Sequence, residues 1–231
     1  MLTLRRLVAV LVMGTVGWLA APPPSAFSWA NGTGGCNSYG GHDWVLDKAI
    51  DAAGKNASWV KRRVALRATD DPDCKEGIDH GSSPWWHVYD RWGDEYGDAD
   101  EATAVWFRRT QRRLDAGRER AASRALGILS HFIADVANPM HTDQSAKEED
   151  LHSPYEDDVD QRIHDYPFRY DGRGTTKPGH RARRVARVAH RSYWDLVNAY
   201  DAHGYNGKVH RITKRQLKRS ANAMADLIIS L

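Results

Sequence analysis

The stretch between His131 and Glu156 concentrates side chains that can bind a metal ion. Histidines and carboxylates recur there with the spacing H-x3-D-x5-H-x10-H-x3-E, at His131, Asp135, His141, His152 and Glu156. The first two and the last two are four residues apart, so on a helix each pair shares one face. Imidazole together with carboxylate suits zinc best among the common metals. These residues exceed the need of one four-coordinate ion, so we interpret the stretch as part of a hydrolytic site with several zinc ions.

Each histidine, taken alone, has an ordinary explanation as a surface or core residue. A single H-x-x-x-D pair is weak evidence for a metal. The pair is repeated nearby as H-x-x-x-E, which makes coincidence a poor explanation. His42, at the predicted start of a helix, and His87, in a Trp-rich segment, are further candidates. Asp79 lies in the acidic loop before His87, and its alternative is a turn-forming residue.

Apolar residues at helical spacing predict the elements that position these side chains. The strongest helix covers 118–136, carries His131 and Asp135 beside its most apolar face, and ends before Pro139. Strand patterns and internal repeats are missing from the sequence. We therefore predict an all-α protein with a single multi-helix, bundle-like domain. The other predicted helices cover 42–53, 58–68, 99–116, 152–163, 181–200 and 212–231, with loops at 29–41, 70–84, 143–150 and 165–180.

Residues 1–28 have the pattern of an export signal. Arg5 and Arg6 precede a short apolar run at 7–21, and a small-x-small cleavage site follows at 26–28. Cleavage after Ser28 leaves a domain of residues 29–231 that begins with Trp29. The alternative is an uncleaved membrane anchor. The sequence therefore predicts a secreted protein.

Three other features bear on the fold and on possible partners. Its two cysteines, Cys36 and Cys74, predict one disulfide, the alternative being two free thiols. The net charge of +3 neither demands nor excludes a partner that bears phosphate. The basic run at 181–191 predicts a solvated helix face, with attraction to an anionic surface as the alternative.

These motifs together resemble the bacterial zinc-dependent phospholipase C family, which shares its fold with the S1/P1 nucleases. The family's H-x-W-x4-A-I is found at 42–50, and its H-F-Y-D resembles 87–90. Its H-Y-x-G-D-x3-P-M-H resembles 131–141, and its H-S-x-Y-E-x2-V-D matches 152–160. The resemblance covers about residues 29–163.

The resemblance implies a secreted all-α protein with three zinc ions. It assigns His87, His131, Asp135 and Asp79 to one ion. A second is held by His42, by the bridging Asp135, and by the amino group and carbonyl of an N-terminal Trp29. Whether Asp79 is a ligand or the general base stays open. The full ligand set implied is Trp29, His42, Asp79, His87, His131, Asp135, His141, His152 and Glu156.

The activity implied is hydrolysis of a phospholipid, at a membrane or vesicle surface, to diacylglycerol and a phosphorylated head group. Glu156 and the short gap between His141 and His152 favour this branch over an extracellular single-strand nuclease, which is the alternative. Nucleic acid is a partner only under that alternative. A non-catalytic zinc protein is a third hypothesis. A monomer without a protein partner is expected. Gly32, His80 and Pro84 stand where choline-preferring members carry acidic or aromatic residues, so the head group stays open.

Overall fold

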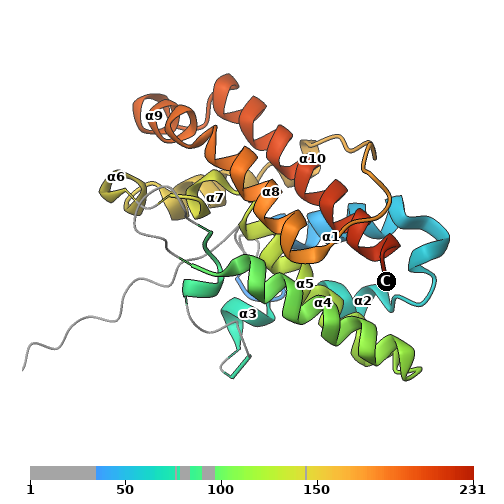
Figure 1. Ribbon diagram of the computed structural model, residues 1–231. Helices are drawn as coiled ribbons and strands as arrows, with labels where there is room; N and C mark the ends of the chain where they lie inside the picture. The colour runs from blue at the N-terminus through green and yellow to red at the C-terminus, as the bar shows by residue number, and fades with distance from the viewer. Residues whose placement is uncertain (1–34, 76, 79–83, 90–96, 144) are drawn as a thin grey trace, which may run out of the picture.

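The computed structural model describes residues 35–75, 77–78, 84–89, 97–143 and 145–231. Helices make up its regular structure, and no strand occurs in these ranges, so the predicted all-α class is confirmed (Figure 1). The α-helices are α1 Gly41–Ala53, α2 Arg62–Arg67, α3 Asp71–Cys74, α4 Ala99–Asp115, α5 Glu119–Asp135, α6 Ala146–Glu149, α7 His152–Asp160, α8 Pro178–His190, α9 Tyr193–His203 and α10 Gly207–Ile229. Short 3-10 turns lie at Gly54–Ala57, Pro84–Trp86, Pro139–His141 and Ile163–Asp165.

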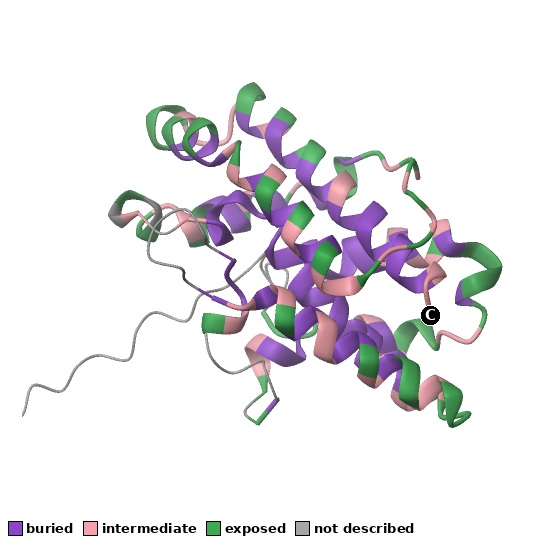
Figure 2. Cartoon of the chain, in the orientation of Figure 1, coloured by how far each residue is buried: buried purple, intermediate pink, exposed green. Residues whose placement is uncertain are grey.

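Helix α5 is the centre of the molecule. It packs against α4, α2, α1, α10 and α8, and every residue from Ala125 to Asp135 is buried (Figure 2). The apolar side chains of its C-terminal half, among them Leu126, Leu129 and Phe132, belong to the hydrophobic core. Burial of such side chains stabilises the fold by roughly 1.5–3 kcal/mol each. A helix held on all sides positions any polar residue on it rigidly.

Helix α2 approaches α5 closely at a glycine. A Cβ built on Gly127 would lie 2.2 Å from the carbonyl oxygen of Ala65 and 2.8 Å from the Cβ of Ala68. Only a residue without a side chain leaves room for this contact. The end of α2 is thereby held against the middle of α5, one turn before His131.

Several predicted boundaries were wrong. The helix expected at 181–200 is two helices, because the chain turns at Arg191 and Ser192 and α9 begins at Tyr193. The last helix begins at Gly207 rather than at residue 212, and the Asn206 side chain caps it by accepting hydrogen bonds from two backbone N–H groups. The segments expected as loops at 70–84 and 143–150 contain α3 and α6, and α2 begins only at Arg62.

The Cys36–Cys74 disulfide is present, as predicted. It joins the segment before α1 to the last residue of α3. No helix within the described ranges is both long and apolar enough to cross a membrane. The predicted signal peptide at 1–28 lies outside the described residues.

Candidate metal centre

Helix α5 places His131 and Asp135 on one buried face, because the two residues are four positions apart. Neither side chain is exposed, and His131 Nε2 lies 3.2 Å from Asp135 Oδ2. Asp135 is the last residue of the helix, and its carboxylate also contacts side chains from two other segments. The predicted central role of this pair agrees with its place in the fold.

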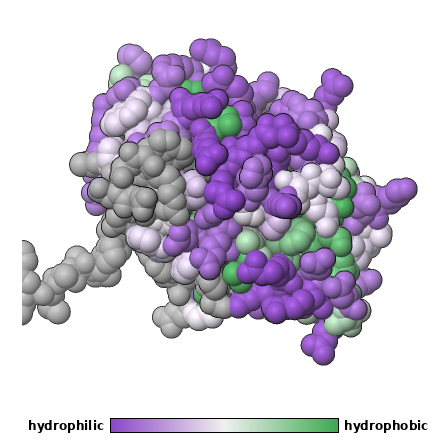
Figure 3. Space-filling model, viewed as in Figure 1, coloured by the Kyte–Doolittle hydropathy of each residue, from purple (hydrophilic) through white to green (hydrophobic). Residues whose placement is uncertain are grey.

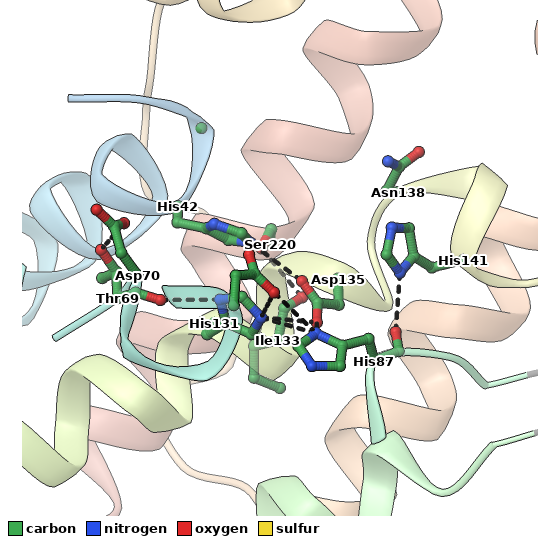
Figure 4. Close-up of polar contacts among 12 residues, drawn as sticks. His42, Thr69, Asp70, His87, His131, Ile133, Asp135, Asn138, His141 and Ser220 are labelled. Atoms are coloured by element: carbon green, nitrogen blue, oxygen red, sulfur yellow. Dashed lines mark hydrogen bonds and ion pairs between the residues drawn. The ribbon is translucent and has the colours of Figure 1, made fainter. Parts of the chain in front are cut away.

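Asp135 lies between histidines from two different segments (Figure 4). Its Oδ1 lies 3.0 Å from Nε2 of His42, the second residue of α1. Its Oδ2 lies 2.9 Å from Nδ1 of His87, which follows the turn at 84–86. One carboxylate therefore faces imidazoles on both sides, as a bridging metal ligand does.

Asp73 completes this part of the site. Its Oδ1 lies 3.4 Å from Nε2 of His131 and 3.5 Å from Nδ1 of His87. It comes from the short helix α3, next to Cys74. Asp73 was not among the predicted residues, and the predicted Asp79 and Trp29 lie outside the described residues. The signal that could have found it is its place beside the disulfide cysteine, which fixes the segment.

His141, His152 and Glu156 form a separate cluster. His141 Nε2 lies 2.9 Å from His152 Nε2, and Glu156 Oε1 lies 2.9 Å from the same His152 atom. His152 and Glu156 share one face of α7, as their spacing predicts. Within the part of the chain that is described, Glu156 Oε2 is buried and has no hydrogen-bond partner. The seven predicted ligands that the structure describes therefore all lie in the two clusters.

Backbone carbonyls orient two of the imidazoles. His131 Nδ1 lies 2.8 Å from the carbonyl oxygen of Thr69, and His141 Nδ1 lies 2.9 Å from that of His87. An Nδ1–H that donates to a carbonyl leaves Nε2 as the lone-pair nitrogen. Both Nε2 atoms point into their clusters. His87 connects the two clusters, because its carbonyl oxygen orients His141 in the second cluster and its side chain belongs to the first.

Asn138 supports the second cluster and was not predicted. Its Nδ2 donates to Glu156 Oε1 at 2.9 Å, and its Oδ1 accepts from the backbone N–H of Met140. It caps the turn that carries His141. A single buried amide thus positions two ligands that come from different segments.

The charges of the first cluster balance one another. Burial alone would raise the pKa of Asp135, but His131, His42 and His87 hold it well below its usual range. Burial alone would lower the pKa of His131, but Asp135 and Asp73 hold it well above its usual range. The same opposition lowers the pKa of Asp73 and raises that of His87. Both carboxylates therefore favour the ionised form, and a bound metal ion would displace the protons that His131 and His87 hold beside them.

A buried acid adjoins the centre on its α1 side. Burial first, and then the nearby Asp70 carboxylate, raise the pKa of Asp43 to about 7. Asp43 accepts hydrogen bonds from the Gly40 N–H and from Thr69 Oγ1, at 3.3 Å each. It thus links the start of α1, which carries His42, to Thr69, whose carbonyl orients His131.

The donor set fits divalent metal ions. Tetrahedral zinc with bonds of about 2.0–2.2 Å keeps its ligand atoms roughly 3.3–3.6 Å apart. Here the facing atoms lie 2.9–3.7 Å apart, from the His87–His131 pair to His141 Nε2 and Glu156 Oε1. Two imidazole nitrogens that face each other at 2.9 Å suit a shared cation better than a hydrogen bond between two acceptors. The donor groups that could each hold an ion are His42–Asp73–His131, His87–His131–Asp135 and His141–His152–Glu156.

Comparison with solved structures supports the fold. The chain is similar to Clostridium perfringens alpha-toxin from avian strain SWCP, with a TM-score of 0.63, 15% sequence identity, and coverage of 84% of this chain and 63% of the toxin chain. It is also similar to the alpha toxin of Clostridium absonum, with a TM-score of 0.67, 15% identity, and coverage of 83% and 62%.

These likenesses confirm the fold that the sequence resemblance implies. The chain spans less than two thirds of the length of either toxin chain. No protein family model matches the sequence, and no curated protein matches it significantly.

Proposed function

We propose that the chain is a secreted zinc-dependent phosphodiesterase of the phospholipase C type, which hydrolyses glycerophospholipids to diacylglycerol and a phosphorylated head group. The observation that carries the proposal is the position of Asp135. Its two oxygens face His42 on one side and the His87–His131 pair on the other, at 2.9–3.2 Å. Such a carboxylate suits a bridge between two metal ions, as the resemblance implies. The His141 cluster supports a third ion.

The zinc ions would be held by the histidines and carboxylates of the two clusters, with Trp29 added as the resemblance implies. When bound, they neutralise the phosphodiester charge and lower the pKa of a bound water toward about 7. The chain's own groups keep the ligands in place. The carbonyls of Thr69 and His87 hold the imidazole protons of His131 and His141, and Asn138 holds Glu156. With Asp73 among the ligands, Asp79 is the candidate general base.

A phospholipid substrate is favoured by two features. Glu156 stands at the last ligand position, and an aromatic side chain is exposed next to the centre. Trp85, two residues before His87, is 39% exposed, and its Nε1 donates to Asp98. A tryptophan held at one edge and open at the other suits a lipid interface. The disulfide supports an extracellular location.

The test compares two classes of substrate, phospholipids and DNA, on one preparation. The form that begins at Trp29, loaded with zinc, is assayed on phosphatidylcholine and phosphatidylethanolamine vesicles and on single-stranded DNA, with a chelator control. Chelator-sensitive release of a phosphorylated head group is the expected result. Release of nucleotides without lipid turnover would assign the chain to the nuclease alternative.

A matched pair of variants links the activity to the centre. Glu156→Gln removes a buried carboxylate from the His141 cluster, whereas Asp157→Asn changes the next residue, which is exposed. We expect Glu156→Gln to lower kcat by at least about a hundredfold and to lose zinc. Asp157→Asn keeps both. Equal activity of the two variants would refute the assignment of this cluster.

A further inference from the structure

A polar groove, separate from the two histidine clusters, lies between α8, α10 and the loop before α8. It measures about 440 Å³ and shares no residue with the two histidine clusters. Hydrophilic side chains cover the face over α8 and α10 (Figure 3). One carboxylate, Asp171, lines the groove, and the cationic side chains that line it are Arg173, Arg181, Arg184, Arg215, Lys218 and Arg219.

Four of these six cations have no carboxylate partner among the described residues. Lys218 Nζ pairs with Asp171 at 2.5 Å, and Arg181 pairs with the buried Asp226 at 2.5 Å. Among the residues that the structure describes, no carboxylate forms an ion pair with the other four arginines of the groove. The groove therefore holds a clear excess of positive charge, which an anion would balance.

The wall of the groove is held in place by hydrogen bonds to a buried carboxylate. Asp226 is fully buried and accepts hydrogen bonds from the Tyr170 hydroxyl at 2.7 Å and from the N–H groups of Arg173 and Gly174 at 2.8 Å each. A Cβ on Gly172 would lie 2.4 Å from Asp226 Oδ1, so only glycine lets the loop come this close. Asp226 thereby fixes both the loop and the Arg181 guanidinium.

Arg181 has one hydrogen-bond donor, Nε, that the described residues do not satisfy. Its side chain is nine-tenths buried, and its Nε has no hydrogen-bond partner among the described residues. Burial first, and then Arg215 and Arg181, lower the pKa of Arg219. Burial also lowers the pKa of Arg181; Asp226 opposes this shift, and Arg184 and Arg173 add to it. Mutual repulsion between arginines is relieved when an anion binds among them.

We propose that this groove binds an anion that carries phosphate groups. Arginine guanidinium groups are planar donors that match the oxygens of a phosphate, and several of them converge here from two helices and a loop. The excess of charge exceeds that of one phosphate dianion, so a ligand with more than one phosphate, or a surface that presents several, fits best. The proposal is independent of the zinc chemistry, because the groove contains no residue of the metal centre.

The test uses the zinc-loaded chain and two probes. Inorganic pyrophosphate is titrated calorimetrically, to detect a soluble ligand. Sedimentation with vesicles of digalactosyldiacylglycerol, with and without phosphatidic acid, detects a lipid head group. The host lipid has no phosphate, and phosphatidic acid is a monoester, so neither is a substrate of a phosphodiesterase. Each probe is applied to the unchanged chain, to Arg184→Gln with Arg215→Gln, and to Arg108→Gln with Arg112→Gln.

The two double variants remove the same charge from different places. Arg184 and Arg215 are exposed and line the groove, whereas Arg108 and Arg112 are exposed on α4 and do not. We expect the groove variant to weaken binding of at least one probe by about tenfold or more. The α4 variant stays within about twofold. Pyrophosphate that binds at the zinc ions should bind both double variants as it binds the unchanged chain. Binding that persists in both variants is therefore assigned to the zinc ions.

The outcomes separate the two sources of phosphate. Loss of pyrophosphate binding alone supports a soluble ligand, and loss of vesicle binding alone supports a lipid head group. Equal weakening by both double variants would mean that only the overall charge matters, and the proposal would be overturned. Failure of both probes to bind the unchanged chain would overturn it as well.

Discussion

Asp135 is the residue on which the metal centre depends most. Asn has the same size but no charge, so Asp135→Asn leaves His42 and the His87–His131 pair without their common carboxylate. We expect the variant to lose more than one zinc ion per chain and at least about a hundredfold in kcat/KM. Equilibrium dialysis with metal analysis measures the first, and circular dichroism shows whether the helices persist. Retention of full zinc content would contradict the bridging role.

Variants of Asp73 and Asp79 distinguish the carboxylate that the structure places in the first cluster from the one that the sequence predicts there. Asp73→Asn should lower zinc content, because its carboxylate faces His87 and His131 at 3.4–3.5 Å. Asp79→Asn should lower kcat while zinc content stays unchanged, if Asp79 acts as the general base. The two variants are compared by metal analysis and by kinetics at several pH values. Zinc loss in Asp79→Asn with full zinc in Asp73→Asn would reverse the assignment.

The histidines that meet in the two clusters could be predicted from the sequence, because each lies in a motif of the resemblance or at helical spacing from a carboxylate. Asp73 was missed, because it lies in an acidic segment where the aspartates look alike and only its place beside a predicted disulfide cysteine marks it. Its place depends on the short helix α3 and on the disulfide at Cys74, which are tertiary features. Asn138 was missed for a similar reason, because its partner Glu156 is eighteen positions away.

At the scale of elements, the contact between α2 and α5 has a measurable consequence. Gly127→Ala places a Cβ against the Ala65 carbonyl, so α2 must move away. We expect the free energy of unfolding to fall by about 1–3 kcal/mol, although alanine is the better helix former. Zinc affinity should fall too, because the displaced end of α2 leads to Thr69, whose carbonyl orients His131. Urea denaturation and zinc titration measure the two effects.

Gly207→Ala is the matched control for this change. Gly207 is the first residue of α10, and a Cβ there would meet only the Arg211 guanidinium at 3.6 Å. Its stability should stay unchanged or rise slightly. If both variants behaved alike, helix propensity rather than the α2–α5 contact would explain the result.

Helix positions were easier to predict than helix ends. The apolar spacing of α5 identified the buried helix that carries two ligands, since a helix surrounded by others needs apolar residues on most of its faces. The break between α8 and α9 has no glycine or proline to mark it, because packing rather than local propensity turns the chain there. The start of α10 was marked by Asn206 and Gly207, a capping pattern that the periodicity alone did not include.

At the scale of the molecule, the disulfide ties the segment before α1 to α3. It closes a loop with a sequence separation of 38, for which chain entropy predicts a stabilisation of about 4 kcal/mol. Cys36→Ser with Cys74→Ser, or a reducing agent, should therefore lower the midpoint of urea unfolding. Zinc affinity should fall in parallel, since Asp73 loses its fixed neighbour. An unchanged zinc affinity in the reduced chain would show that α3 is held by other contacts.

The same covalent link ties the first histidine cluster to the redox state of its surroundings. Asp73, which faces His87 and His131, adjoins Cys74, so its segment is held covalently only where thiols are oxidised. If the cluster binds zinc as we propose, oxidation of the two thiols acts as a maturation step that precedes tight binding of the metal.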